Sequence, residues 1–288
     1  MIKTKTHRKH LYTPLRYPGG KTSLFEFFSH VIESHNWKDV IYIEPYAGGA
    51  GAALSLLILG KVNAVIINDY DPAIYSFWLS IINDTDSFIE KIETTELTIE
   101  EWQKQKKIYK AADLNRPLDL GFATFYLNRT NHSGILNAGP IGGMAQTGKW
   151  KMNARYNKTS LINKIRLIQS KKDKISVTHK DGIEIIKEYG STDKSFFYVD
   201  PPYFIKGTDL YLNAFKLEDH ENLANTLNEF KNSKWLLTYD NEPEIRQLYV
   251  LRNYRPFDLR YSAHPNSGSG SELMFFSNVI NPQVIDGI

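Results

Sequence analysis

The chain has 288 residues, of which 42% are hydrophobic and 23% are charged, which is an ordinary globular composition with enough length for one large domain or two smaller ones. It contains no cysteine, which excludes disulfides, thiolate metal sites and a cysteine nucleophile. The net charge is only +3, so the overall charge does not select a partner. The first residues are mostly polar and no apolar run reaches the length of a membrane span, so we expect a cytoplasmic protein without a membrane partner.

The N-terminal region combines a basic arm with a glycine-rich turn. Residues 1–13 are rich in Lys, Arg and His, and we expect them to be poorly ordered. Arg16-Tyr17-Pro18-Gly19-Gly20-Lys21-Thr22 follows, and an amphipathic run over 24–32 predicts a helix. Gly20-Lys21-Thr22 resembles the end of a phosphate-binding loop, but the glycine that such a loop needs at position 15 is a leucine, which excludes an NTPase site.

A predicted strand over 40–43 continues through Glu44-Pro45-Tyr46-Ala47 into a glycine-rich turn and an apolar helix over 52–59. This order is typical of the first strand–turn–helix unit of a doubly wound sheet, in which a nucleoside-type cofactor lies at the carboxyl ends of the strands. The glycines are bunched at Gly48, Gly49 and Gly51 and do not follow the G-x-G-x-x-G spacing. This bunching argues against a dinucleotide whose pyrophosphate lies on the start of the helix.

The second predicted strand, 64–67, ends at Asn68-Asp69. An acidic residue in this place is typical of a contact with ribose hydroxyls. The alternative is that Asp69 caps the next helix, but Asp71-Pro72 already supplies the cap and the first helical residue for a helix over 73–82. We therefore expect Asp69 to contact a ligand.

The alternation of strands and helices breaks between residues 85 and 170. Thr98-Ile99-Glu100-Glu101 is a capping box that opens a polar helix, 122–127 suits a buried helix or strand, and a long Gly-, Asn- and Gln-rich loop follows. A stripe of basic residues with Asp173 as its one acid comes next: Lys149, Lys151, Arg155, Lys158, Lys164, Arg166, Lys171, Lys172 and Lys174. A solvated face is one explanation, but in a nearly neutral chain the stripe better suits nucleic acid. We predict an inserted, mainly helical target-recognition domain at 85–170 and a catalytic domain made of 1–84 and 171–288.

The α/β alternation resumes after residue 170. A strand over 175–178 leads to Asp181-Gly182 and a helix that ends at Tyr189. Asp181 either caps this helix or lies near the base of the cofactor. Further predicted elements are a helix over 218–230, a strand over 235–239, a helix from Pro243 and a terminal hairpin. The Ser/Gly-rich loop of the hairpin is preceded by arginines suited to DNA, namely Arg252, Arg255 and Arg260.

The most informative stretch is the apolar strand 195–199 with the Asp200-Pro201-Pro202-Tyr203 that ends it. Two prolines cannot donate to a sheet ladder, so the strand ends there and the segment after it is stiff and non-helical. The Asp200 carboxylate and the Pro201 carbonyl can accept hydrogen bonds from the amino group of a planar ring, and Tyr203 can stack on that ring. The alternative is a proline-terminated strand at a domain surface.

Four motifs resemble those of Dam-type adenine-N6 DNA methyltransferases and stand in that family's order. They are Arg-Tyr-Pro-Gly-Gly-Lys (16–21), Glu-Pro-Tyr-Ala-Gly-Gly-Ala-Gly (44–51), Asn-Asp (68–69) and Asp-Pro-Pro-Tyr (200–203). The resemblance spans nearly the whole chain and implies the α/β fold of S-adenosylmethionine-dependent methyltransferases, a mostly parallel doubly wound sheet with an antiparallel last hairpin. Asn128-Arg129 matches an Asn-Arg pair of the family's recognition domain. The following residues, 130–134, depart from the Phe-Asn-Gly segment of members that read GATC, so the resemblance does not carry over the target sequence.

The resemblance, together with the residue patterns, implies a site for each substrate. S-adenosylmethionine is expected against Tyr17, Lys21, Pro45, Tyr46, Ala47, Gly48, Gly49, Gly51, Asp69, Asp181 and Asp200. The expected catalytic residues are Asp200, Pro201, Pro202 and Tyr203. Double-stranded DNA is expected against Asn128, Arg129, Lys151, Arg155, Lys158 and Arg260. The histidines are scattered and no metal is expected, whereas a restriction endonuclease or another defence-system component is a candidate partner.

These expectations predict methyl transfer to N6 of an adenine in duplex DNA. An adenine inside the duplex is out of reach, so the base must be flipped into a pocket, where Tyr203 stacks on it and Asp200 accepts from its amino group. The transfer is expected to be direct and in line. The alternatives are an NAD-dependent oxidoreductase, which the bunched glycines and Asp-Pro-Pro-Tyr oppose, a non-catalytic nucleic-acid-binding protein, and an RNA adenine methyltransferase.

Overall fold

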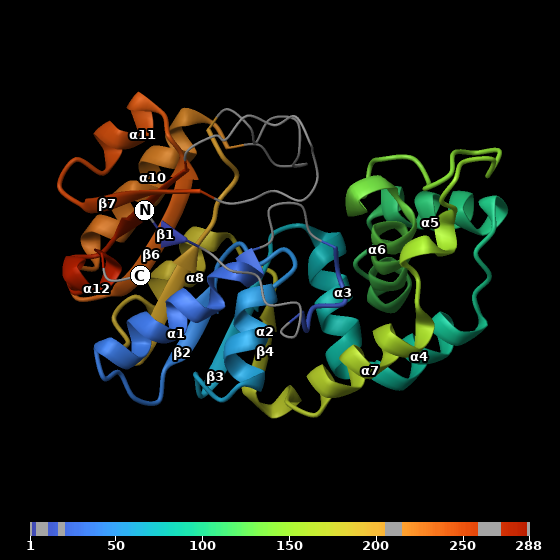
Figure 1. Cartoon of the computed structure of the whole chain (residues 1–288), viewed down its shortest axis with the longest axis horizontal. Coiled ribbons are helices and arrows are strands. Elements are labelled where there is room, and N and C mark those ends of the chain that lie inside the picture. Colours follow the sequence, from blue (N-terminus) through green and yellow to red (C-terminus); the bar gives the residue numbers. More distant parts are fainter. Residues whose placement is uncertain (1, 4–10, 17–20, 205–214, 259–271, 287–288) are drawn as a thin grey trace.

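One sheet carries the predicted motifs and lies in one lobe of the molecule (Figure 1). The structure is a computed structural model and describes residues 2–3, 11–16, 21–204, 215–258 and 272–286. Within these residues the sheet has the strand order β1-β7-β8-β6-β5-β2-β3-β4. The strands are β1 (Ile2–Lys3), β2 (Ile41–Glu44), β3 (Ala64–Asn68), β4 (Ile175–Thr178), β5 (Ser195–Val199), β6 (Lys234–Asp240), β7 (Asn253–Asp258) and β8 (Glu272–Phe276). Strand β8 pairs antiparallel with β6 and β7, and the other neighbouring pairs are parallel.

The direction of winding reverses between β2 and β5. From β2 the sheet continues through β3 to β4, and from β5 it continues through β6 in the opposite direction. Ligands of doubly wound sheets bind at the carboxyl ends of the strands beside such a reversal. Pro45, Asp69 and Asp200 directly follow β2, β3 and β5, so the topology brings three of the predicted motifs to one edge of the sheet.

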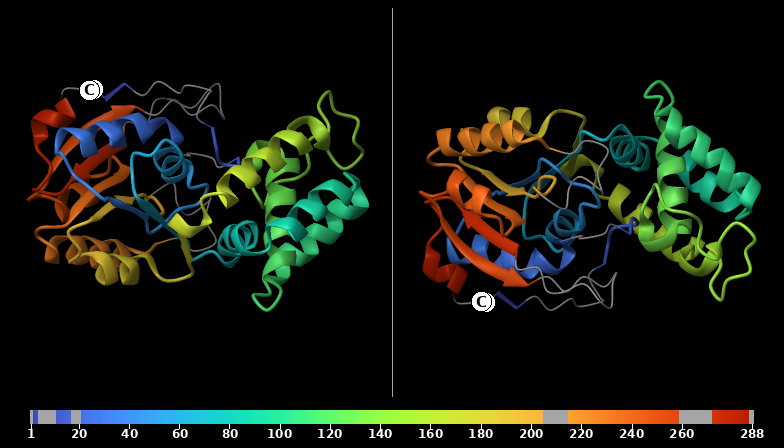
Figure 2. Two further views of the ribbon diagram at one scale, coloured as in Figure 1. Left: turned by 90° about the horizontal axis from the view of Figure 1, so that it is seen from below. Right: turned by 90° about the horizontal axis from the view of Figure 1, so that it is seen from above.

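Helices cover both faces of the sheet (Figure 2). In this lobe they are α1 (Phe25–Ser34), α2 (Gly51–Ile58), α8 (Gly182–Tyr189), α10 (Leu217–Glu229), α11 (Pro243–Leu248) and α12 (Pro282–Asp286). Successive side chains of a strand point to opposite faces. Accordingly Tyr42 and Phe196, which are paired across β2 and β5, lie in one apolar cluster with Phe28 of α1. Their neighbours Ile43 and Phe197 lie in the second cluster, with residues of α8, α10 and α11.

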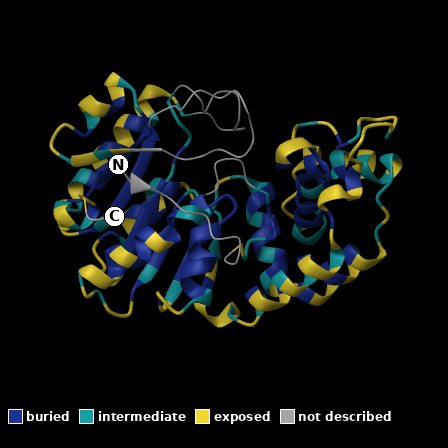
Figure 3. Ribbon diagram, viewed as in Figure 1, coloured by how far each residue is buried: buried dark blue, intermediate teal, exposed yellow. Residues whose placement is uncertain are grey.

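The chain between β3 and β4 is helical, and most of it forms the second lobe (Figure 1). Its helices are α3 (Pro72–Asn83), α4 (Thr85–Thr94), α5 (Ile99–Ala111), α6 (Pro117–Thr130) and α7 (Lys158–Gln169). Gly121 lets α6 lie directly against α3, since a Cβ there would stand 2.4 Å from the Ser76 carbonyl oxygen. The rings of Phe77 in α3 and Phe125 in α6 stack with centroids 6.2 Å apart. Both rings belong to the same buried cluster as the sheet residue Tyr42, so the core continues from one lobe into the other (Figure 3).

The structure confirms the predicted doubly wound, mostly parallel sheet and its antiparallel terminal strands. The run 122–127, for which helix and strand were alternatives, lies inside α6. The prediction of a poorly ordered arm is wrong for Ile2–Lys3, which pair with β7, while residues 4–10 lie outside the described part of the chain. None of the described helices is long and apolar enough to cross a membrane.

Candidate active site

Asp200 directly follows β5, and its two carboxylate oxygens have different neighbours. Thr238 of β6 donates its hydroxyl hydrogen to Oδ1 over 2.7 Å, and the phenol oxygen of Tyr198 lies 2.7 Å from that hydroxyl. The Lys21 ammonium lies 3.4 Å from Oδ2. Lys21 was predicted to line the cofactor site, and the structure brings its side chain to the Asp-Pro-Pro-Tyr segment.

The hydroxyl of Tyr203 lies among three charged groups. It accepts from Lys21 Nζ at 2.9 Å and donates toward Glu272 Oε2 at 2.9 Å, while Asp200 Oδ1 is farther away at 3.3 Å. Lys21 Nζ is 5.2 Å from the ring centroid, so the ammonium lies beyond the hydroxyl and does not cover the ring face. Burial, followed by the charges of Asp200 and Glu272, raises the pKa of Tyr203 well above its usual value, so the phenol keeps its proton.

The far end of the segment is also fixed. The Phe204 N–H donates to Asp240 Oδ1 at 3.1 Å, and Asp240 pairs with Glu272 across β6 and β8. Hydrogen bonds therefore hold Asp200 and Phe204, and the two prolines between them have fixed φ angles. The result is a rigid segment with a carboxylate beside an aromatic ring, which can hold a planar ring that carries an amino group.

Asp69 joins the end of β3 to the 45–51 turn. Its Oδ2 accepts from the Gly48 N–H at 2.8 Å and its Oδ1 from the Asp71 N–H at 2.9 Å. Burial, followed by the charge of Asp71, raises the pKa of Asp69 to about 7. Asp71 accepts from the Ala73 N–H at 2.8 Å, which confirms the prediction that Asp71 caps α3.

Asn68 holds the ends of three strands together. Its fully buried amide donates to the carbonyls of Pro45 at 2.8 Å and Lys180 at 2.9 Å. Its oxygen accepts from the Thr178 hydroxyl at 2.8 Å and the Lys180 N–H at 3.0 Å. The position of the turn after β2 therefore depends on Asn68, to which the sequence pattern assigned no role beyond its place beside Asp69.

The glycines of the turn permit two close approaches. A Cβ at Gly51 would stand 2.0 Å from the Thr22 hydroxyl oxygen, so a side chain here would force this hydroxyl to move. Gly48 has a φ of 47°, in the left-handed region, and its carbonyl accepts from Trp78 Nε1 at 2.8 Å. Because Thr22 follows Lys21 in the chain, the approach at Gly51 also sets the position of Lys21 relative to the turn.

Glu44, the last residue of β2, is a buried carboxyl beside the turn. Its side chain accepts from the Ala53 N–H at 3.2 Å in the first turn of α2. Burial raises the pKa of Glu44 to about 8, and the charge of Asp200 adds to the rise, while the nearby Tyr42 hydroxyl and the Ala53 N–H oppose it. Glu44 is therefore largely protonated at neutral pH.

Tyr46 and Asp181 lie beside the start of α8. A Cβ at Gly182 would stand 2.3 Å from the Tyr46 ring, so this glycine makes room for the ring. The Tyr46 hydroxyl is buried and has no hydrogen-bond partner within the described residues. Asp181 is exposed and caps α8 by accepting from the Ile183 N–H at 2.7 Å, which is one of its two predicted roles.

Asn128 of α6 holds the N-terminal segment. Its Oδ1 accepts from the Arg16 N–H at 2.7 Å, and its Nδ2 donates to the carbonyls of Arg16 and Gly134, both at 2.9 Å. The residue is only 2% exposed and both amide hydrogens are used. The prediction that Asn128 contacts DNA has no support in this geometry, because its side chain is committed to backbone groups inside the protein.

A cationic cluster forms where the N-terminal segment crosses α6 and α7. Its members are Arg16, Arg129, Arg155 and Lys164. Arg129 Nε donates to the Arg155 carbonyl at 2.7 Å, and Lys164 Nζ donates to the Thr13 carbonyl at 3.1 Å. Burial, followed by the charges of Arg16 and Arg155, lowers the pKa of Arg129 to about 10. Burial and the charge of Arg129 likewise lower the pKa of Lys164. Cations that repel one another in this way favour a bound anion.

The other basic residues of the helical lobe have different surroundings. Lys151 is exposed, as is Arg155 of the cationic cluster. Lys158 Nζ donates at 2.6 Å to a backbone carbonyl of α4, whereas Arg166 forms an ion pair with Asp86 at 2.6 Å. The sequence has no acidic residue from 120 to 172, so nothing on this stretch of chain offsets its positive charge.

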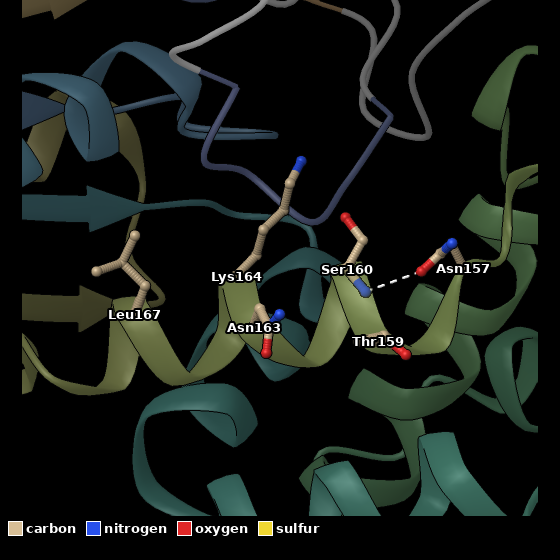
Figure 4. Close-up of a pocket in the computed structure, with 6 residues that line it drawn as sticks. All are labelled: Asn157, Thr159, Ser160, Asn163, Lys164 and Leu167. Atoms are coloured by element: carbon tan, nitrogen blue, oxygen red, sulfur yellow. Dashed lines mark hydrogen bonds between the residues drawn. The ribbon is translucent and has the colours of Figure 1, made fainter.

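A polar pocket runs along α7 beside the cationic cluster (Figure 4). Ser160 and Lys164 project from the same side of the helix, and Asn157 caps the helix by accepting from the Ser160 N–H at 2.9 Å. The pocket is lined by Asn157, Thr159, Ser160, Asn163, Lys164 and Leu167. None of these residues belongs to the Asp-Pro-Pro-Tyr site, and Lys164 is the residue that the pocket shares with the cationic cluster.

Two predicted site residues, Tyr17 and Arg260, lie outside the described residues, and their roles stay predictions. Within the described ranges no group of His, Asp and Glu side chains could hold a metal ion.

A family model covers most of the chain. Residues 17–262 match the model of D12 class N6 adenine-specific DNA methyltransferases. The chain belongs to this family. It is therefore an adenine-specific DNA methyltransferase, it acts on DNA, and the family implies S-adenosylmethionine as the methyl donor. A search of curated proteins found no match.

Three residues of this D12 class methyltransferase site were missed by motif reasoning, namely Thr238, Asp240 and Glu272. Thr238 and Glu272 contact Asp200 and Tyr203, and Asp240 contacts Phe204, the residue that follows the motif, each from a strand far away in the sequence. Glu272 had a usable signal, since it is an acid at the start of an apolar strand after a Ser/Gly-rich loop. The first residue of an antiparallel last strand lies at the edge where the parallel strands end.

Glu44→Gln is expected to flatten the dependence of stability on pH. The pKa of Glu44 is about 8 in the folded protein and lies near 4.5 in the unfolded chain, so the folded state binds the extra proton between these values. The wild-type free energy of unfolding should therefore fall as pH rises from about 4.5 to about 8 and level off above, and glutamine removes this contribution. Urea unfolding of both proteins across this range provides the measurement, and parallel curves would contradict the assignment.

Proposed function

We propose that this D12 class methyltransferase transfers the methyl group to N6 of an adenine that has been flipped out of the DNA duplex and lies beside Asp200 and Tyr203. The observation that carries the proposal is the rigid Asp-Pro-Pro-Tyr segment, in which a carboxylate and an aromatic ring are fixed at the carboxyl edge of the sheet. A stacked and paired adenine cannot enter such a site, so the base must leave the helix.

The roles of the segment follow from its groups. Tyr203 stacks on the adenine, and Asp200 and the Pro201 carbonyl accept hydrogen bonds from the N6 amino group. These acceptors turn the nitrogen lone pair away from the ring and toward the methyl carbon. When bound, S-adenosylmethionine supplies this carbon on a positively charged sulfur. Held at the ends of β2 and β3, S-adenosylmethionine would offer this carbon to N6 with a neutral thioether as the leaving group, and N6 would lose one proton to water. The acceleration of methyl transfer comes from the positioning of the adenine against the methyl group and from the fixed dipoles of the acceptors around N6.

The residues at the ends of β2 and β3 fit the methyl donor. Each Asp69 oxygen accepts one backbone N–H and keeps a lone pair for a ribose hydroxyl. The Tyr46 hydroxyl, buried without a partner among the described residues, is available to a polar group of the donor. We assign the remaining contacts to Tyr17, Lys21, Pro45, Ala47, Gly48, Gly49, Gly51, Asp181 and Asp200.

The helical lobe, residues 85–170, is assigned to target recognition. The cationic cluster, and the acid-free stretch that supplies its members Arg129, Arg155 and Lys164, suit DNA phosphates. Arg129 and Arg155 contribute to the cluster, and Lys151, Lys158 and Arg260 are assigned to the same interface. Asn128 acts indirectly, by holding Arg16 next to these cations.

Asp200→Ala is expected to abolish methyl transfer and to leave the fold intact, because the change removes the acceptor for the N6 amino group but no part of the core. The assay follows a labelled methyl group from S-adenosylmethionine to DNA that lacks adenine methylation. Asp193→Ala, which removes an exposed acid just before β5, is the matched control and should transfer at the wild-type rate. Turnover by Asp200→Ala equal to that of the wild type would rule out the mechanism.

Arg155→Ala is expected to weaken DNA binding and to lower the slope of log affinity against log salt by about one, since one phosphate contact is lost. Arg166→Ala is the control, because Arg166 is already paired with Asp86. The measurement is a DNA-binding titration at several salt concentrations. An unchanged slope for Arg155→Ala would remove the cationic cluster from the DNA interface.

A further inference from the structure

Glu272 is a buried acid beside the active site that lies beyond the residues matched by the family model, 17–262. It begins β8, and its side chain is 1% exposed. Its Oε2 lies 2.9 Å from the Tyr203 hydroxyl and 3.5 Å from the Lys21 ammonium. Lys21 is therefore nearly equidistant from two carboxylates, since Asp200 Oδ2 lies at 3.4 Å.

The phenol of Tyr203 has one hydrogen and two carboxylates within reach. The distance to Glu272 is 2.9 Å and that to Asp200 is 3.3 Å, so the hydrogen goes to Glu272. Asp200 Oδ1 already accepts from the Thr238 hydroxyl at 2.7 Å. By accepting this hydrogen, Glu272 prevents the Tyr203 hydroxyl from becoming a second donor to Asp200, the carboxylate that must accept from the adenine amino group.

The position of the Lys21 ammonium follows the same pattern. Its short hydrogen bond, 2.9 Å, is made to the Tyr203 oxygen, whereas its contact with Asp200 is 3.4 Å, longer than a charge-assisted hydrogen bond. If Glu272 lost its negative charge, Asp200 would be the one remaining carboxylate beside Lys21 and Tyr203, and Lys21 would move toward it. A short ion pair between them would occupy Asp200 Oδ2, and the adenine amino group would lose its acceptor.

We propose that Glu272 is a positioning residue, which shares the Lys21 ammonium with Asp200 and takes the hydroxyl hydrogen of Tyr203, so that Asp200 Oδ2 stays available to the adenine amino group. This role rests on the proposed function of Asp200. It concerns the transfer step more than the binding of S-adenosylmethionine, because the groups whose placement it sets, Asp200 and Tyr203, are those assigned to the adenine.

The test compares Glu272→Gln with wild type in methyl transfer to unmethylated genomic DNA. The expected result is a kcat lowered by roughly 10- to 100-fold, as for a small misplacement of reacting groups, with little change in the KM for S-adenosylmethionine. Glu244→Gln, the same substitution at an exposed site of α11, is the control and should match wild type. Glu272→Asp keeps the charge on a shorter side chain and should recover part of the lost rate.

A double-mutant cycle separates positioning from a general loss of stability. Lys21→Met is expected to lower kcat by itself, because it removes the donor to the Tyr203 hydroxyl. Adding Glu272→Gln should then lower kcat much less than Glu272→Gln does in wild type, because Lys21 is no longer there to occupy Asp200. Independent, multiplicative losses would overturn the proposal, as would a wild-type kcat in Glu272→Gln. If Glu272→Gln does not fold, the same cycle is run with Glu272→Ala, and a wild-type kcat in that variant or independent, multiplicative losses with Lys21→Met overturn the proposal.

The same assay distinguishes this proposal from the proposed function. Wild-type transfer that is lost in Asp200→Ala upholds the function whatever the Glu272 variants do. Absence of transfer by the wild type, with S-adenosylmethionine bound, contradicts both.

Discussion

The active site depends on the contacts that the Lys21 ammonium makes with its neighbours. Lys21 reaches Asp200 after β5, Tyr203 in the segment that follows, and Glu272 at the start of β8. One cation thus joins three groups from distant parts of the chain, and its contact with Tyr203 spans 182 positions of sequence. Because two carboxylates share this cation, the placement of each depends on the other.

The same lysine links the catalytic edge of the sheet to the helical lobe through the chain. The segment that leads to Lys21 is held at Arg16 by Asn128 of α6 and at Thr13 by Lys164 of α7. Thr22, on the other side of Lys21, lies against Gly51 in the turn after β2. Residues that we assign to DNA and residues that we assign to the methyl donor therefore contact the two sides of one short segment.

Much of the fold follows from local patterns. Apolar strands, glycine-rich turns and helix caps such as Asp71 are set by residues near one another in sequence, and these predictions agree with the structure. The order of the motifs, read with the rule that ligands bind at the carboxyl ends of parallel strands, also brings Asp69 and Asp200 to one edge.

The remaining parts of the site depend on long-range pairing, which motif spacing does not contain. Glu272 meets Tyr203 across 69 positions, and Asn128 meets Arg16 across 112. An asparagine amide can bond a DNA base or a backbone with the same groups, so residue type alone did not separate these roles for Asn128. Only its burial and its partners assign it to the protein interior.

The most direct test of the account is methyl transfer from labelled S-adenosylmethionine to genomic DNA that lacks adenine methylation, followed by single-molecule mapping of the modified bases. The account predicts N6-methyladenine within one short sequence motif, and the map would supply that motif. Binding of S-adenosylmethionine without any methylated adenine in the DNA would contradict it.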